Sequence, residues 1–154
     1  MIKPRLYFDT SVFGGIYDAE FQRETEKLFE MVTKGEIVCV YSDLTEFELE
    51  NAPDLIKAHF LNLNRESIEF VEITEEINQL ALDYIHENVV GESSIDDCRH
   101  IACATVNKVD YLISWNFKHI VNVFRIRGYN SINIKKGYMQ LDIRSPKEII
   151  SNEN

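Results

Sequence analysis

Short apolar runs alternate with amphipathic stretches along the chain. The residues at 37–41, Ile-Val-Cys-Val-Tyr, form a continuous apolar run of strand length, and a shorter run at 5–8 ends at Asp9. Continuous runs of this kind are typical of strands in a parallel sheet that is covered on both faces. The pattern predicts strands at 5–8, 37–41, 68–73, 111–114 and 131–134.

Between these runs, apolar residues recur every three or four positions, which is the spacing of an amphipathic helix. Leu28, Phe29 and Val32 share one face of the stretch 22–33, and Gly35 follows as a helix stop. The pattern predicts helices at 22–33, from Ser42 or Asp43 onward, from Pro53 to Leu63, from Thr74 onward, from Ser93 or Ser94 to Val106, and over part of 116–128.

Strand and helix alternate throughout this predicted order, which indicates a three-layer α/β/α sandwich with a mainly parallel central sheet. No repeat, low-complexity tract or linker rich in glycine and serine interrupts the chain. Residues 1–154 are therefore predicted to form a single domain, and a hydrophobic content of 45% is enough for one sizeable core.

The apolar runs and the cysteines bear on membrane association and on the cellular compartment. No apolar run approaches the roughly 18 residues of a membrane span, and no signal-peptide stretch follows Met1. Cys39, Cys98 and Cys103 are odd in number, form no CxxC pair and lie in apolar segments, which argues against a disulfide framework or a zinc cluster. We expect a soluble, cytoplasmic protein with reduced core cysteines and no membrane association.

The charge is unevenly distributed. The net charge is -10, which opposes binding to nucleic acid, yet the segment Tyr111–Leu141 contains no Asp or Glu and carries five basic residues. Such asymmetry can mark a face that binds nucleic acid, and a cluster of ordinary solvated cations would give the same pattern. The basic residues of this segment are Lys118, Arg125, Arg127, Lys135 and Lys136.

Two polar residues come directly after predicted strands. Asp9 follows the strand at 5–8, and Asn116 follows the strand at 111–114. In open α/β sheets, ligands bind beyond the carboxyl ends of the strands, so both side chains are candidates for a functional site. The structural alternatives are that Asp9 is a turn or cap residue and that Asn116 caps the short segment 116–120.

Glu48 is a third candidate, because it lies four residues after Leu44 in the helix that follows the second strand. That spacing would direct it toward the edge of the sheet. Glu46 and Glu50 are equally acidic, so all three could instead form a solvated helix face.

Asp97 is the fourth candidate. With Ile101 and Ala104 it follows the spacing of the buried side of its helix, although an acid in a first helical turn is also favoured by the helix dipole. Asp96 and His100 are four residues apart and could form a metal pair, or more commonly a surface hydrogen bond.

These residues lie in segments that resemble motifs of the PIN-domain family. Phe8–Val12 resembles its opening Asp-Thr/Ser-Ser/Asn motif, Ser42–Leu49 its serine-to-Glu-Leu segment, and Asp97–Ala104 its Asp-x-x-x-Ile-Ala-x-Ala helix. Leu112–Phe117 resembles the strand that ends in Ser/Thr-x-Asp, in the form of a sub-group with Asn at that position. The resemblance covers about residues 5–125, with the four motifs in the family's order.

The resemblance implies a metal-dependent endoribonuclease, in which Asp9, Glu48 and Asp97 bind Mg²⁺ or Mn²⁺ and Asn116 occupies a fourth, neutral position. Hard divalent cations prefer such oxygen ligands. Thr10 and Ser11 are expected to orient the Asp9 carboxylate or the attacking water. Contacts to RNA are expected from Lys118, Arg125 and Arg127.

Many PIN proteins are toxins of toxin-antitoxin pairs and many form dimers, so the resemblance also suggests an antitoxin partner and a homodimer. An Asp-nucleophile phosphatase is disfavoured, because position 11 is Ser rather than a second Asp, and the paired acids of a phospho-receiver domain are absent. A catalytically weak PIN fold that binds RNA or protein stays open, since Asn116 and the overall acidity favour it.

Overall fold

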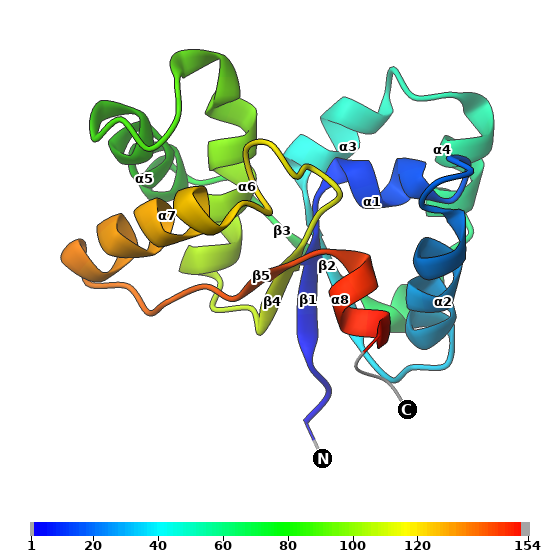
Figure 1. Cartoon of the computed structure of the whole chain (residues 1–154). Helices are drawn as coiled ribbons and strands as arrows, with labels where there is room; N and C mark the ends of the chain where they lie inside the picture. The colour runs from blue at the N-terminus through cyan, green and yellow to red at the C-terminus, as the bar shows by residue number, and fades with distance from the viewer. Residues whose placement is uncertain (1, 152–154) are drawn as a thin grey trace.

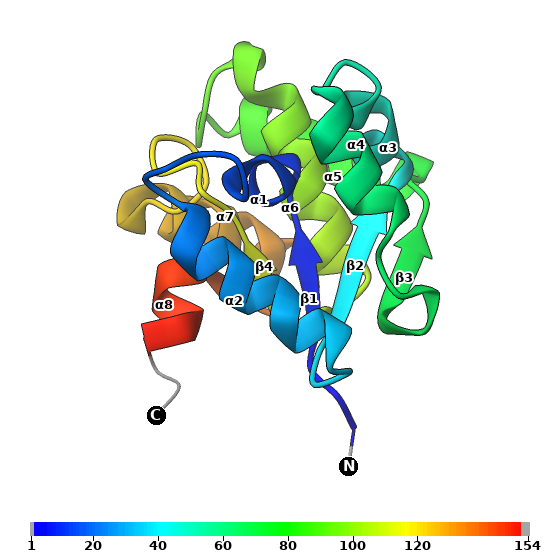
Figure 2. The same cartoon turned by 90° about the vertical axis from the view of Figure 1, so that its right-hand side faces the viewer.

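The structure is a computed structural model that describes residues 2–151. Its centre is a five-stranded sheet in the order β3-β2-β1-β4-β5, and every neighbouring pair of strands is parallel. All carboxyl ends of the strands therefore lie at one edge, which faces upward in Figures 1 and 2. The strands are β1 (Arg5–Phe8), β2 (Val38–Ser42), β3 (Ile68–Val71), β4 (Tyr111–Ile113) and β5 (Ile143–Arg144).

Helices cover both faces of the sheet, as Figure 1 shows, so the predicted three-layer α/β/α sandwich is confirmed. One layer contains α1 (Thr10–Gly15), α2 (Gln22–Thr33), α3 (Asp43–Leu49), α4 (Asp54–Leu61) and α8 (Pro146–Ser151). The other contains α5 (Glu75–His86), α6 (Ile95–Val106) and α7 (Val123–Lys135). Short 3-10 turns, η1 (Arg65–Ser67) and η2 (Glu92–Ser94), precede β3 and α6.

The two helical layers produce two hydrophobic cores, and β1 contributes to both. Leu6 and Phe8 point into the core beneath α1, α2 and α4, whereas Tyr7 points into the core beneath α5, α6 and α7. This alternation follows from the two-residue period of a strand. A strand buried on both faces must be apolar at consecutive positions, as the run before Asp9 is.

The prediction of a last strand at 131–134 is wrong, because these residues belong to α7. Apolar and polar residues alternate at 131–134 as they do in a strand, but Ile132 is buried whereas Ile134 is 56% exposed. The buried side of α7 also contains two amides, Asn130 and Asn133, which obscure the helical period. Asn130 exchanges hydrogen bonds with the backbone of Leu141, so its burial is compensated. The true last strand is β5, which is only two residues long.

The other predicted strands and helices are present with small differences at their ends, except that the helix predicted within 116–128 begins at Val123 and continues to Lys135. Ser42 rather than Asp43 caps α3, and its hydroxyl accepts from the backbone N–H of Thr45 in a capping box. Thr74 caps α5, and its hydroxyl accepts from the backbone N–H of Ile77. Ser94 occupies the cap position of α6 but makes no side-chain cap bond.

The predicted burial of Leu28, Phe29 and Val32 is confirmed, and the three cysteines are buried free thiols. Within residues 2–151, no helix combines the length and apolar character needed to cross a membrane.

Candidate active site at the carboxyl ends of the strands

Asp9 lies directly after the central strand β1 and is 4% exposed. Its carboxylate accepts a hydrogen bond from Ser11 Oγ at 2.5 Å on Oδ1 and from Ser114 Oγ at 2.6 Å on Oδ2. Both serine oxygens in turn accept backbone N–H groups, from Trp115 and Asn116 respectively, at 2.9 Å. Asp9 stands at the N-cap position of α1 but makes no side-chain cap bond, so its carboxylate serves this strand-end network instead.

Trp115 anchors the network to the helical layer. Its indole N–H donates to Thr25 Oγ1 at 2.9 Å, and its ring stacks on Phe21 with centroids 4.1 Å apart. A Cβ atom on Gly15 would lie 2.5 Å from Thr25 Oγ1 and 2.7 Å from Trp115 Nε1, so only glycine fits here without displacement. The backbone that positions Ser11 is therefore held by close packing.

Glu48 lies on the side of α3 that faces this network and is half-buried, whereas its neighbours Glu46 and Glu50 are exposed. Thr10 Oγ1 donates to Glu48 Oε1 at 2.7 Å, and His100 Nε2 lies 2.5 Å from the same oxygen. Burial raises the pKa of Glu48, but the hydrogen bond and charge of His100 and the bond from Thr10 outweigh it and lower the pKa. The environment therefore keeps this carboxyl group ionised.

His100 was not predicted as a partner of Glu48. It is 2% exposed, and its Nδ1 lies 2.7 Å from the Tyr7 hydroxyl, which in turn contacts Ser42 Oγ at 2.8 Å. The suggested pairing of His100 with Asp96 is wrong, because Asp96 is exposed and makes an ion pair with Arg99. The available signal was the position of the histidine three residues after Asp97, on the same helical face.

Asp97 extends from the first turn of α6 and contacts Asn116, whose Nδ2 donates to Asp97 Oδ2 at 3.2 Å. The Asn116 Oδ1 atom accepts the backbone N–H groups of Lys118 and His119, so Asn116 also caps the turn after β4, as the structural alternative predicted. Burial raises the pKa of Asp97, and the negative charge of Asp9 raises it further.

The three carboxylates interact electrostatically although they come from distant segments. Burial raises the pKa of Asp9, and the charge of Glu48 acts in the same direction. Close acids that oppose one another's ionisation form an environment that a cation would stabilise. Across residues 2–151, no three His, Cys, Asp or Glu side chains already surround one point as metal ligands. The donor chemistry nevertheless fits Mg²⁺, which commonly takes one or two protein carboxylates and retains several waters.

Several cations of the acid-free segment are engaged elsewhere in the protein. The Arg125 guanidinium donates to the carbonyl of Val89, in the loop between α5 and α6. Lys135 and Lys136 make ion pairs, at 2.9 and 3.9 Å, with acids of α5 and its C-terminal end. Lys118 and Arg127 are exposed and make no side-chain hydrogen bond or ion pair to the rest of the described chain. Only these two of the predicted RNA-contacting residues are thus unengaged.

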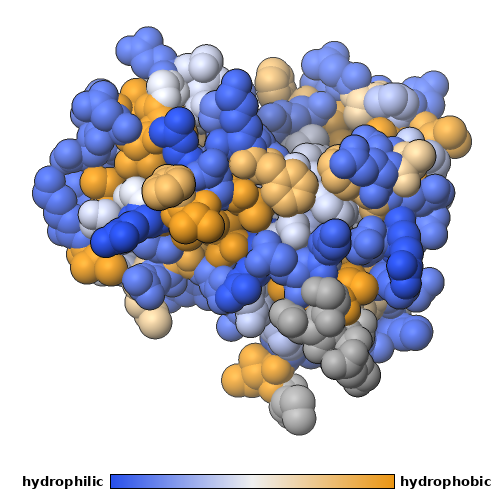
Figure 3. All heavy atoms as spheres, viewed as in Figure 1, coloured by the Kyte–Doolittle hydropathy of each residue, from blue (hydrophilic) through white to orange (hydrophobic). Residues whose placement is uncertain are grey.

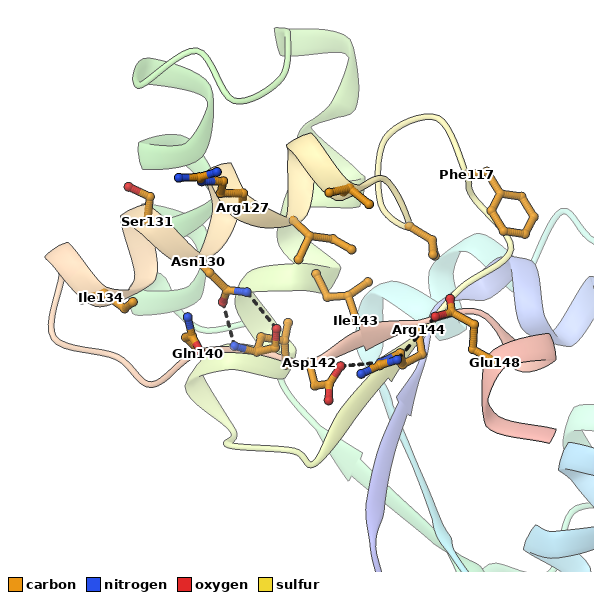
Figure 4. Close-up of a pocket in the computed structure, with 14 residues that line it drawn as sticks. Phe117, Arg127, Asn130, Ser131, Ile134, Gln140, Asp142, Ile143, Arg144 and Glu148 are labelled. Atoms are coloured by element: carbon orange, nitrogen blue, oxygen red, sulfur yellow. Dashed lines mark hydrogen bonds and ion pairs between the residues drawn. The ribbon is translucent and has the colours of Figure 1, made fainter. Parts of the chain in front are cut away.

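A surface hollow of about 910 Å³ lies between α7, the turn after β4, and β5. Figure 3 shows apolar side chains gathered on this side of the molecule, and Figure 4 shows Arg127 and Phe117 at the wall of the hollow. None of Asp9, Glu48 and Asp97 lines it. Its apolar lining consists mainly of Val121, Val123, Ile126, Ile134, Leu141 and Ile143.

Comparison with known proteins identifies the fold. No protein-family model matches the chain, and no curated protein sequence matches it either. A solved toxin-antitoxin complex from Klebsiella pneumoniae contains a chain with 17% identity and a TM-score of 0.55, over 73% of this chain and 88% of that one.

Two further solved structures match over longer stretches. VapBC2 from Rickettsia felis, bound to a promoter DNA fragment, matches with 12% identity and a TM-score of 0.55, over 92% of this chain and 98% of that one. VapC20 from Mycobacterium tuberculosis, a toxin that cleaves the sarcin-ricin loop, matches with 12% identity and a TM-score of 0.56, over 88% and 98%. The chain therefore has a PIN-type fold like that of the VapC toxins.

Proposed function

We propose that this protein is a Mg²⁺- or Mn²⁺-dependent endoribonuclease. The proposal is supported by the placement of Asp9, Glu48 and Asp97, from three separate segments, in hydrogen-bond networks near the carboxyl ends of the strands, and by their mutual electrostatic effects. This edge is where open α/β sheets bind their ligands. The fold shared with the solved toxin VapC20, which cleaves the sarcin-ricin loop, supports RNA as the substrate class.

The residues of the site would hold and orient the ion from three directions. Asp9, Glu48 and Asp97 would supply oxygen ligands, with waters completing the coordination. Such an ion lowers the pKa of bound water and offsets charge on phosphate oxygens. Ser11 fixes the Asp9 carboxylate and Thr10 fixes that of Glu48, so these two ligands would be positioned before substrate arrives.

Asn116 would occupy the fourth position without adding charge. Its amide already donates to Asp97 and its oxygen accepts two backbone N–H groups. A neutral residue here weakens a second cation site before it weakens the first, so we propose one tightly bound ion.

The direct test is cleavage of single-stranded RNA by the purified protein in the presence of Mn²⁺ or Mg²⁺. We expect cleavage that is abolished by excess EDTA and restored by adding Mn²⁺. Undiminished cleavage in EDTA would exclude the metal-dependent reaction. An Asp97→Asn preparation, purified in parallel, controls for contaminating ribonuclease.

We further propose that the nuclease is the toxin of a type II toxin-antitoxin pair, and that an antitoxin protein is its partner. The support is the fold, which is shared with chains from solved toxin-antitoxin complexes. A short adjacent reading frame with a DNA-binding motif should encode the partner, and its product should co-purify with this chain and suppress cleavage. Sedimentation analysis of the purified chain would test the accompanying proposal of a homodimer.

A second candidate is a PIN fold that binds RNA or protein without efficient catalysis. It is favoured by the neutral Asn116 and by the hydrogen bonds that already occupy each of the three carboxylates. Tight RNA binding without cleavage at any concentration of Mn²⁺ would establish this alternative.

A further inference from the structure

His100 belongs to a buried hydrogen-bonded chain that ends at the candidate active site. Both of its ring nitrogens have partners, the Tyr7 hydroxyl on Nδ1 and Glu48 Oε1 on Nε2. Tyr7 is fully buried on the central strand β1, and Ser42, which contacts its hydroxyl, caps the helix that carries Glu48. The imidazole, which belongs to α6, is thus held between a group from the sheet and a group from α3.

The direction of the bond to Glu48 follows from the chemistry of its partner. An ionised carboxylate only accepts hydrogen bonds, so His100 Nε2 carries the proton and donates it to Glu48 Oε1. The Tyr7 hydroxyl can donate a hydrogen bond to Nδ1 of a neutral ring or accept one from Nδ1 of a charged ring. In both cases Nε2–H faces Glu48, so this arrangement does not depend on the protonation state of the ring.

Both hydrogen bonds to Glu48 fall on the same oxygen. Oε1 accepts from Thr10 and from His100, whereas Oε2 has no hydrogen-bond partner within residues 2–151. Turning the carboxylate away from this orientation would break both bonds at once. The Glu48 side chain is 29% exposed and that of His100 3% exposed, so the bond lies at the boundary between the core and the site.

We infer that His100 is a positioning residue that fixes the Glu48 carboxylate through Oε1 and leaves Oε2 directed to a cation or water. This inference rests on the proposed function. Groups that hold a ligating side chain in place commonly change metal affinity by about 10–100-fold when they are removed. His100 would act through Glu48 and would not contact the reacting phosphate.

Three variants separate positioning from ordinary structural support. His100→Leu removes the donor but keeps an apolar side chain in the core, and His100→Gln restores an N–H donor near the position of Nε2. Tyr7→Phe disturbs the same buried chain at its far end and leaves the bond to Glu48 intact. Mn²⁺ affinity of the metal-free full-length proteins would be measured by calorimetry, alongside their melting temperatures and their cleavage of single-stranded RNA.

We expect Mn²⁺ affinity to fall about 10–100-fold in His100→Leu and to stay within about threefold of wild type in His100→Gln. Tyr7→Phe should lower the melting temperature while keeping Mn²⁺ affinity within about threefold. Wild-type affinity in His100→Leu would overturn the inference. Equal losses in all three variants would also overturn it, because they would show general destabilisation.

The inference and the proposed function can fail separately. If the wild-type protein binds Mn²⁺ but cleaves no RNA, the function fails and the Mn²⁺ affinities still decide the role of His100. If it binds no Mn²⁺, crystal structures of the metal-free variants decide it. The Glu48 side chain should keep its wild-type conformer in His100→Gln and adopt others in His100→Leu. An unchanged Glu48 conformer in both variants would overturn the inference that His100 positions this side chain.

Discussion

The carboxylate site and the acid-free segment 111–141 use charge in opposite ways. The acids of the site are scattered over the sequence, at positions 9, 48 and 97, and the fold brings them together. The cations of the segment are close in sequence, and the fold engages three of them, since Arg125, Lys135 and Lys136 bind groups of α5 and the loop after it. A cluster of cations along the chain therefore need not be available to a ligand on the surface.

The two regions also differ in what compensates their charges. The acids are held mainly by neutral hydroxyl and amide donors, which orient a carboxylate without cancelling its charge. The engaged lysines instead face carboxylates directly. The first arrangement preserves charge for a ligand, whereas the second stabilises the packing of α7 on α5.

Among the changes that test this difference, the largest effect is expected on RNA cleavage in Asp97→Asn. Cleavage should fall at least about 100-fold, because a charge-stabilising group is lost. The metal-free protein should be as stable as wild type or more so, since burial and neighbouring acids oppose ionisation of Asp97 and Asn keeps an acceptor for Asn116. Cleavage assays and thermal melts with and without Mn²⁺ would measure both effects.

Asp96→Asn is the matched control for that experiment. Asp96 is adjacent in sequence but exposed, and it pairs only with Arg99. Its replacement should keep cleavage and the Mn²⁺-induced rise in melting temperature. A metal-free Asp97→Asn protein that is destabilised, yet responds normally to Mn²⁺, would show that Asp97 is an ordinary helix-start residue.

The next largest effect concerns Arg125, whose guanidinium binds the Val89 carbonyl. Arg125→Ala should lower the free energy of unfolding by about 1–2 kcal/mol, because a charged hydrogen bond is lost and the carbonyl is left without its donor. RNA affinity and its salt dependence should not change. Urea denaturation and RNA titrations at several salt concentrations would test this, and a loss of RNA affinity at unchanged stability would assign Arg125 to the RNA surface.

A smaller effect is expected from replacing Lys118 and Arg127 together by Ala. If both contact phosphates, the slope of log affinity against log salt should decrease by about 1.4 for single-stranded RNA. Stability should change by less than about 0.5 kcal/mol, as for most exposed substitutions. Lys135→Ala with Lys136→Ala removes the same charge from the engaged part of the segment. If both double variants gave the same slope, the exposed pair would contribute no more to RNA binding than the engaged pair.

The smallest effect is the pH dependence of the metal-free protein. The folded-state pKa of Asp97 is raised above its ordinary value of 3.8, so ionisation of Asp97 costs stability at neutral pH, and that cost disappears as the pH falls through the raised pKa. The stability of wild type should therefore approach that of Asp97→Asn as the pH is lowered from 7.5 through the raised pKa of Asp97. Denaturation in EDTA would measure this, and a constant difference between the two proteins would contradict it.

Glu48 sets the lower limit of that pH range. Its pKa is lowered from the ordinary 4.5, so its contribution to stability is present above that value and is lost only as the pH falls through the lower, folded-state pKa. Wild type and Asp97→Asn both contain Glu48, so the difference in stability between them reports mainly on Asp97.

The strand-end position of Asp9 could be predicted because one apolar run ends there, and the layered fold followed from alternation of runs and amphipathic stretches. The choice of Glu48 over Glu46 and Glu50 could not follow from spacing alone. It depends on His100 and Thr10, which are 52 and 38 residues away in the chain. Local patterns cannot encode contacts whose partners come from other elements.

The incorrect last strand has a related cause. Hydrophobic periodicity treats every amide as a surface residue, but Asn130 and Asn133 are buried where Leu141 and Thr105 satisfy them. The hydrogen bond from Arg125 to a backbone carbonyl could not be predicted either, because every residue has a carbonyl and the sequence does not single one out.

The position of β1 in the centre of the sheet has a consequence for the timing of folding. Asp9 is made early during synthesis, but the Ser114 hydroxyl that holds it is made 105 residues later, and β1 pairs with β4 across the same separation. Contacts between such distant segments form slowly, since a long loop must close first. The hydrogen bonds that hold the Asp9 carboxylate can therefore be completed only after Ser114 has been made, so the proposed site forms after most of the sheet has been synthesised.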